Sequence, residues 1–305
     1  MNTQSSHTAD GKSWGMLLLL SLIWGGSFLF IAIAVNDLAA LQIVLARVVI
    51  AAAVLVPVHL MVQGALPRDK KTWIAAGGMS IMNNIIPFTL ITWGQHFITG
   101  GLASVVNATT PMFAAVFMAL AGMEAITPRK AIALVIGLVG VAVLQGINFS
   151  GLTAQSLGIL AVAVASAFYG LSAPWSKKML TGIPPITTAT CQLMISSVLM
   201  SCIVMMFGDI GQLTRVSTTT WMALIGLAVL STSIAYLLFF GIIQRAGPSF
   251  VSLVTMIIPV SAILLGYFVI GEKLKLLDIV GASIIGVALV IIDGRLLKRF
   301  GLITA

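Results

Sequence analysis

The second half of this chain repeats the first. A shift of 148 residues superposes identical residues without a gap: Thr72-Trp73 on Thr220-Trp221, Gly78 on Gly226, Pro111 on Pro259 and Glu124 on Glu272. Each half also contains five long apolar runs, given below. Because a unit with an odd number of membrane crossings reverses direction when it is repeated, the two copies must have opposite orientations in the membrane. The repeat therefore predicts two inverted units of five helices each.

The composition places these runs in a membrane. Of the 305 residues 59% are hydrophobic and only 8% are charged, whereas about a quarter of residues are charged in a soluble domain. Runs of roughly 20 apolar residues suit helices that cross about 30 Å of hydrocarbon, and are too long for membrane β-strands. We expect an all-α membrane protein with ten transmembrane helices, at 14–35, 40–62, 72–93, 97–121, 129–147, 157–175, 185–207, 219–243, 248–270 and 276–297.

The basic residues orient these helices. If the amino terminus is cytoplasmic, twelve Lys and Arg residues fall in inside segments and three in outside loops, and orientation follows this asymmetry. We therefore expect cytoplasmic tails at 1–13 and 300–305, a first repeat at 14–150 and a second, inverted repeat at 151–299. The basic residues are dispersed over short loops, which favours anionic lipid headgroups as partners over nucleic acid.

Inverted repeats are typical of secondary transporters, whose substrate site lies near the midplane between the copies. All eight acidic residues fall in loops or at the ends of apolar runs, and proton-driven transporters commonly carry an ionisable group within the membrane. The sequence thus favours movement of a solute down its own gradient. Arg47 is the one charge well within an apolar run; it could snorkel outward, pair with backbone carbonyls or face a substrate carboxylate.

The sequence offers little support for an enzyme. Its His, Cys, Asp and Glu residues show no metal-ligand spacing, and no nucleophile, base and orienting acid occur together. We expect neither a cofactor nor a metal.

Uncharged polar residues recur at equivalent positions of the two repeats. Asn83 and Asn84 precede Phe88 in the third run, and the offset aligns these positions with Ser231, Thr232 and Tyr236 in the eighth. An amide in hydrocarbon is costly unless a neighbouring helix, a water or a ligand binds it. Contact between helices explains each residue about as well as a ligand does, but the recurrence favours a substrate-binding belt.

Prolines interrupt the fourth and ninth runs. A proline frees a backbone carbonyl one turn earlier, and broken helices in both repeats mark the binding region of a transporter. We expect Pro111 and Pro259 to act as hinges. The polar residues beside them are candidate lining residues of the site: Asn107, Thr110, Ser252 and Thr255.

Several motifs resemble those of one family. The segment Trp24-Gly25-Gly26-Ser27 is similar to the opening signature of EamA-type proteins of the drug/metabolite transporter superfamily, and Tyr169-Gly170-Leu171-Ser172 is its counterpart in the second half. The segment around Arg47 and two hairpins, from Pro111 through Glu124 and from Pro259 through Glu272, match further parts of the family pattern. The resemblance covers nearly the whole chain, and is greatest to bacterial aromatic amino-acid exporters of the YddG type.

The resemblance implies ten helices in two inverted halves around a central cavity. It also implies structural roles for three charged residues, Arg47, Glu124 and Glu272. Gly25 and Gly26, with the two prolines, would permit one group of helices to rock against the other.

The aromatic residues suggest an amphiphilic solute. Rings at Trp24, Phe88, Tyr169, Trp175 and Tyr236 can receive an apolar side chain, while amides and hydroxyls, including those of Ser27 and Ser172, can bind an ammonium and a carboxylate. We therefore expect a bacterial inner-membrane exporter of aromatic and other apolar amino acids that works by alternating access without proton coupling. The alternative is efflux of drugs or other amphiphilic metabolites, coupled to protons. We expect a monomer, with a homodimer as the alternative.

Overall fold

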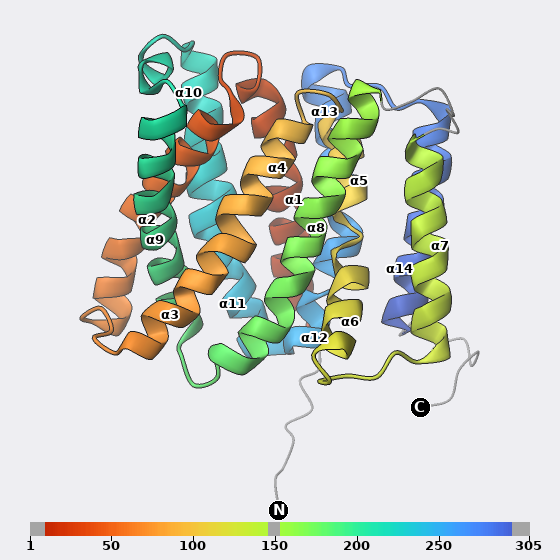
Figure 1. The fold of residues 1–305 in the computed structure, drawn as a ribbon, viewed down its shortest axis with the longest axis horizontal. Coiled ribbons are helices and arrows are strands. Elements are labelled where there is room, and N and C mark those ends of the chain that lie inside the picture. Colours follow the sequence, from red (N-terminus) through yellow and green to blue (C-terminus); the bar gives the residue numbers. More distant parts are fainter. Residues whose placement is uncertain (1–9, 146–152, 295–305) are drawn as a thin grey trace, which may run out of the picture.

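The computed structural model describes residues 10–145 and 153–294, and all regular secondary structure in this part of the chain is helical (Figure 1). The elements are α1 (Gly11–Ala34), α2 (Ala40–Gln63), α3 (Lys70–Met79), η1 (Ser80–Ile85), α4 (Ile86–Gly94), α5 (Gly100–Asn107), α6 (Thr110–Leu120), α7 (Pro128–Gln145), α8 (Ala154–Met179), α9 (Pro185–Phe207), η2 (Ile210–Thr214), α10 (Thr218–Ile225), η3 (Gly226–Ile234), α11 (Ala235–Ala246), α12 (Pro248–Val251), α13 (Val254–Ile270) and α14 (Leu276–Asp293).

Eight helical stretches are long and apolar enough to cross a membrane. They are α1, α2, α3–η1–α4, α5–α6, α8, α9, α10–η3–α11 and α14. A shorter apolar helix, α13, has 17 residues, and α7 has 18. Each of the ten expected runs thus corresponds to a helical stretch, although the expected ends at 147 and 297 lie outside the described residues. The chain is a multi-pass membrane protein.

The side chains show two kinds of apolar surface. One buried cluster surrounds α1 and includes Leu17, Leu20 and Ile159, and a second lies between α2, α9 and η3. On the outside, Leu120 and Phe268 are 77% and 76% exposed. Such faces would be costly in water, and they suit contact with lipid.

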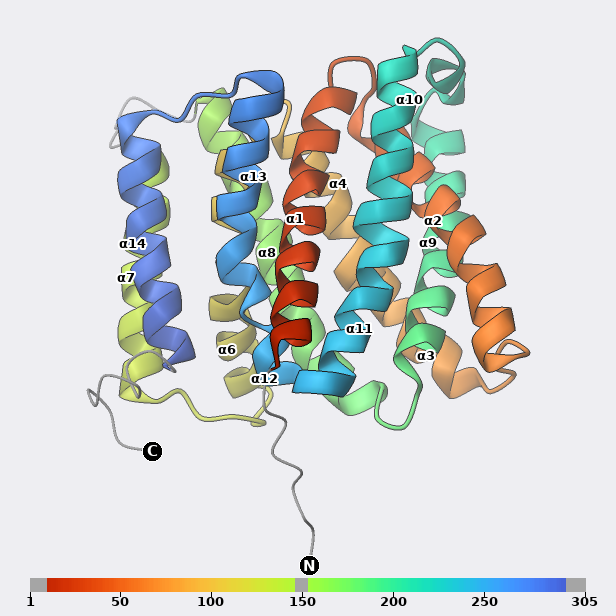
Figure 2. The ribbon, with the colours of Figure 1, turned by 180° about the vertical axis from the view of Figure 1, so that it is seen from behind.

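Helices α7 and α14 form a pair at one edge of the molecule (Figures 1 and 2). Small residues let the two helices approach closely. A Cβ atom on Gly140 would lie 2.7 Å from Ile285 Cγ1, and one on Gly281 would lie 3.0 Å from the carbonyl oxygen of Gly140.

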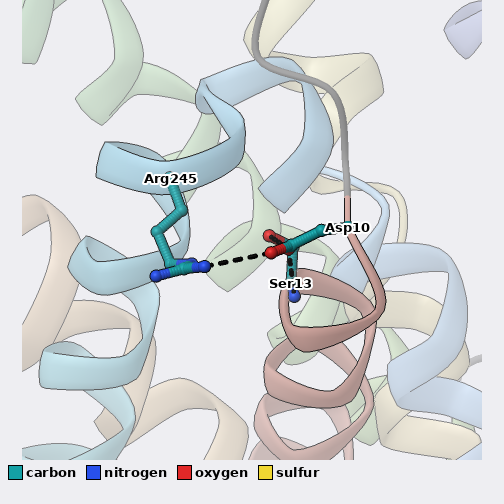
Figure 3. A network of polar contacts seen from close by, with 3 residues as sticks. All are labelled: Asp10, Ser13 and Arg245. Atoms are coloured by element: carbon teal, nitrogen blue, oxygen red, sulfur yellow. Dashed lines mark hydrogen bonds and ion pairs between the residues drawn. The ribbon is translucent and has the colours of Figure 1, made fainter.

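Asp10 fixes the start of α1. Its Oδ1 accepts hydrogen bonds from the backbone N–H and the hydroxyl of Ser13, at 2.9 and 2.6 Å, and its Oδ2 pairs with Arg245 Nη2 at 3.0 Å (Figure 3). The Ser13 hydroxyl and backbone, and then Arg245, favour the charged carboxylate and lower the pKa of Asp10 to about 2. The contact ties the first turn of α1 to the end of α11.

Two spans contain π-helical turns at their centres. Segment η1 interrupts the α3–α4 span, and η3 interrupts the α10–α11 span. The 148-residue shift maps η1 onto residues 228–233, which lie within η3. Turns of this type are rare and concentrate at functional sites.

The two spans that contain Pro111 and Pro259 are both broken, though not at equivalent positions. The first breaks at Ala108 and Thr109, between α5 and α6, and Pro111 follows in the first turn of α6. The second breaks at Ser252 and Leu253, four residues before the position equivalent to Ala108, and Pro259 lies inside α13. The helix therefore breaks next to Pro111, as expected, whereas Pro259 lies within a continuous helix and the break precedes it by six residues.

Candidate functional site

A chain of hydrogen bonds joins polar side chains of η1, α9 and α11. We call these residues the polar belt: Ser80, Asn84, Gln192, Ser196 and Tyr236. Tyr236 donates to Asn84 Oδ1 at 3.1 Å, and Asn84 Nδ2 donates to Ser196 Oγ at 3.0 Å. Gln192 Nε2 donates to the Tyr236 oxygen at 3.1 Å. Asn84 and Ser196 are completely buried, so the belt replaces water for groups that would otherwise be costly in the membrane.

The direction of each bond follows from the number of protons available. The Ser196 hydroxyl donates to the carbonyl oxygen of Gln192 at 2.7 Å, so it must accept from Asn84 and from Ser80, whose hydroxyl lies 2.8 Å away. Asn84 then presents its oxygen to Tyr236. Since the Tyr236 proton is used there, Gln192 must donate through Nε2. Its Oε1 is left buried without a donor among the described residues.

Arg47 lies beside this belt, about two turns from the start of α2, and is only 7% exposed. Its Nε donates to Thr232 Oγ1 at 3.0 Å, and its guanidinium carbon lies 3.5 Å from the ring centroid of Phe88. Thr232 in turn donates to the carbonyl oxygen of Leu227 at 2.9 Å, a bond that the π-helical turn provides. Arg47 therefore links α2 to both π-containing spans, and no carboxylate of the described residues pairs with it.

The expected aromatic residues lie in different surroundings. Trp24 contacts Phe239, with ring centroids 5.5 Å apart. Tyr236 stacks on Phe240 at 6.2 Å. The Trp175 indole donates to the carbonyl oxygen of Ala75 at 3.0 Å, which fixes α8 against α3.

Several expected hydroxyls bind the backbone of their own membrane span. Each donates to the carbonyl three residues earlier: Ser27 to Trp24, Thr110 to Asn107, Ser172 to Tyr169 and Thr255 to Ser252. The Asn107 side chain accepts from Ser166 at 3.4 Å. Asn83 is partly exposed, and Ser252 is exposed.

The structure thus brings together Phe88, Asn84, Thr232 and Tyr236 around Arg47. Two further residues of the site, Gln192 and Ser196 on α9, are not among those expected from the sequence. They lie four residues apart on one helical face, a polar spacing that was visible in the seventh run.

The two repeat-equivalent glutamates make different contacts. Glu272 accepts hydrogen bonds from the backbone N–H groups of Gly100 and Gly101, whereas Glu124 is half exposed and pairs with Lys130. A pocket of about 410 Å³ lies beside Glu272 and is also lined by Asn36, Gln95 and His96. Burial lowers the pKa of His96, which favours its neutral form.

Comparisons with known proteins agree with this architecture. The family model described as the EamA-like transporter family matches residues 12–145 and 156–292. The chain is 24% identical to the uncharacterized transporter YoaV of Bacillus subtilis (strain 168) over 88% of this chain and 92% of that protein. It is 27% identical to the uncharacterized inner membrane transporter YedA of Escherichia coli (strain K12) over 92% and 90%. A solved crystal structure, 16% identical, has a similar fold with a TM-score of 0.65, covering 95% of this chain and 98% of the other.

Proposed function

Because the chain belongs to the EamA-like transporter family, we propose that it exports aromatic and other apolar amino acids across the bacterial inner membrane, as YddG-type proteins do. The observation that carries this proposal is the polar belt with Arg47 and Phe88 beside it. The belt contributes buried amides and hydroxyls and the Tyr236 ring, and its neighbours contribute a guanidinium and a second ring. Such a site offers polar contacts to a zwitterionic head and apolar contacts to a side chain.

The helix contacts support alternating access by two inverted halves. Helix α1 packs against α13 and against α10, η3 and α11, and α8 packs against α5 and α6 and against α3, η1 and α4. In the repeat, α1 corresponds to α8, and the partners of α1 correspond to the partners of α8. The two helices of the α2–α9 pair correspond to each other, and so do those of the α7–α14 pair. This is the pattern that two repeats related by a two-fold axis in the membrane plane would make. In this proposal both termini are cytoplasmic.

The charges favour a facilitator over a proton-coupled drug exporter. All eight acidic residues lie in loops or in the first or last turn of a helix, away from the belt where a proton carrier would act. Arg47 also repels a hydrophobic cation, the usual form of a drug substrate. We propose a monomer in which the solute moves down its own gradient.

Transport by the purified protein in liposomes tests this proposal. We expect saturable uptake of labelled phenylalanine, tryptophan and methionine without an imposed gradient, and its loss in Asn84→Ala. Imposed pH and potential gradients should change the rate little. If hydrophobic cations were transported instead, in response to a pH gradient, the proposal would be wrong.

A further inference from the structure

We propose that Arg47 binds the carboxylate of the transported solute. The inference rests on the proposed function and names the group of the solute that the belt recognises. It assigns to Arg47 a binding role in place of the structural role that the family resemblance implies.

The Arg47 guanidinium has hydrogen-bond donors that the protein does not use. An arginine side chain has five N–H groups in a planar fork. In the described residues the guanidinium makes one hydrogen bond, from Nε to Thr232, so its four Nη–H groups have no protein acceptor. Neither Nη atom is among the fully buried atoms that lack a partner, so both keep some accessible surface. An arginine that served only to hold helices together would use these donors on carbonyls or carboxylates.

The positive charge of Arg47 has no counterion among the described residues. Arg47 is 7% exposed, and a buried cation without a counterion is expensive. The face of Phe88 provides part of the compensation. A carboxylate would provide the rest, and its two oxygens match the arginine fork in a bidentate pair.

Arg47 also lies next to polar groups that could bind the rest of an amino acid. Arg47 donates to Thr232, which lies four residues before Tyr236 on the same span, so Arg47 adjoins the polar belt. The same belt contains one buried acceptor without a donor, Gln192 Oε1. An amino acid would supply both missing partners, a carboxylate for Arg47 and an ammonium for Gln192.

Binding measurements on a ligand series test the proposal. Competition with labelled phenylalanine on the purified protein gives the affinities of phenylalanine, phenylalaninamide, which lacks the carboxylate, and 3-phenylpropionate, which lacks the ammonium. We expect the wild-type protein to prefer phenylalanine over its amide by about tenfold or more, as for hydrogen bonds to charged groups. In Arg47→Met this ratio should fall to about one, and in Arg47→Lys it should be intermediate because the charge remains without the fork.

Arg245→Met is the matched control. It removes the same charge at an exposed ion pair, and the ratio should stay at the wild-type value. A purely structural Arg47 would weaken both ligands equally and leave the ratio unchanged in Arg47→Met, which would overturn the inference. If Arg47→Met does not fold, the wild-type series still decides, because equal affinity for phenylalanine and its amide also overturns it.

The same series separates the inference from the proposed function. Equal binding of phenylalanine and its amide would leave amino-acid export standing without the Arg47 contact. If no amino acid bound but direct binding of labelled 3-phenylpropionate depended on Arg47, the amino-acid proposal would fail and the carboxylate site would stand. Absence of binding by all of these ligands would overturn both.

Discussion

Glu272 caps helix α5, because its Oε1 accepts a hydrogen bond from the backbone N–H of Gly100 at 2.8 Å. The bond joins residues 172 apart in sequence, one in the loop after α13 and the other at the start of α5. A carboxylate suits this place because the first N–H groups of a helix have no partner within the helix and carry a partial positive charge. The loop after α13 and the start of α5 are thereby held together.

We predict that Glu272→Gln loosens this end of the molecule. The amide keeps one acceptor oxygen instead of two and loses the charge, at a cost of about 1 kcal/mol. The buried Ala103, one turn into α5, should then become more accessible. In a background without Cys191 and Cys202, the labelling rate of Ala103→Cys by a thiol reagent should rise about fivefold, the factor that corresponds to this energy.

Glu124→Gln is the control for this experiment. Glu124 is equivalent in the repeat, but it is half exposed and pairs only with Lys130 in the described residues, and exposed pairs contribute little. An equal increase in labelling for the two variants would contradict a capping role for Glu272.

A second prediction concerns Asp10, whose pKa is lowered from 3.8 to about 2 in the folded protein. Because the folded-state pKa is lower than the unfolded one, the stabilisation is nearly complete above about pH 4 and is lost as the pH falls through 2. Asp10→Asn should lower the melting temperature at neutral pH, and the difference should shrink as the pH approaches 2 and vanish well below it. Asp37 and Asp69 also have lowered pKa values, so thermal unfolding of the variant and the wild type must be compared at each pH. A pH-independent difference would contradict the prediction.

Sequence patterns predicted the positions of the helices but not the side-chain contacts of the candidate site. Apolar length is a strong signal, and it located every helical stretch to within a few residues. The π-helical turns at Asn84 and Thr232 carry no comparable signal, because the same polar pairs could sit in a regular helix. The position of Arg47 over Phe88 depends on how α2 packs against α4, and no spacing within one helix specifies that contact.

A third prediction tests the direction of the hydrogen bonds in the polar belt. Asn84→Leu leaves the Tyr236 hydroxyl without its acceptor, and removes one of the two donors to Ser196. Leaving a buried polar group without a hydrogen-bond partner costs about 1–3 kcal/mol. Ser80→Ala removes only a donor to Ser196, which still accepts from Asn84, and should cost less. Thermal unfolding in detergent should rank wild type, Ser80→Ala and Asn84→Leu in descending stability, and the reverse order of the two variants would show that the bonds run differently.

The last prediction separates close packing from hinge motion in α1. Figure 2 shows α1 beside α13, and Ser261 of α13 donates to the carbonyl oxygen of Ser21 at 2.7 Å. A Cβ on Gly25 would lie 2.2 Å from Ser261 Oγ and 2.8 Å from the backbone nitrogen of Ala262, whereas the nearest atoms to a Cβ on Gly26 are 3.8 Å away.

Gly25→Ala should therefore push α1 away from α13 and cost about 1–3 kcal/mol, as overpacking does. Gly26→Ala has room for its methyl group, and should be neutral or stabilise by up to about 1 kcal/mol through reduced backbone freedom. Melting temperature and transport rate, measured on both variants, distinguish the two roles. If both glycines are hinges, both variants should transport slowly at undiminished stability. If Gly25 is a packing position, only Gly25→Ala should melt earlier, because the backbone of α13 cannot yield as a flexible side chain could.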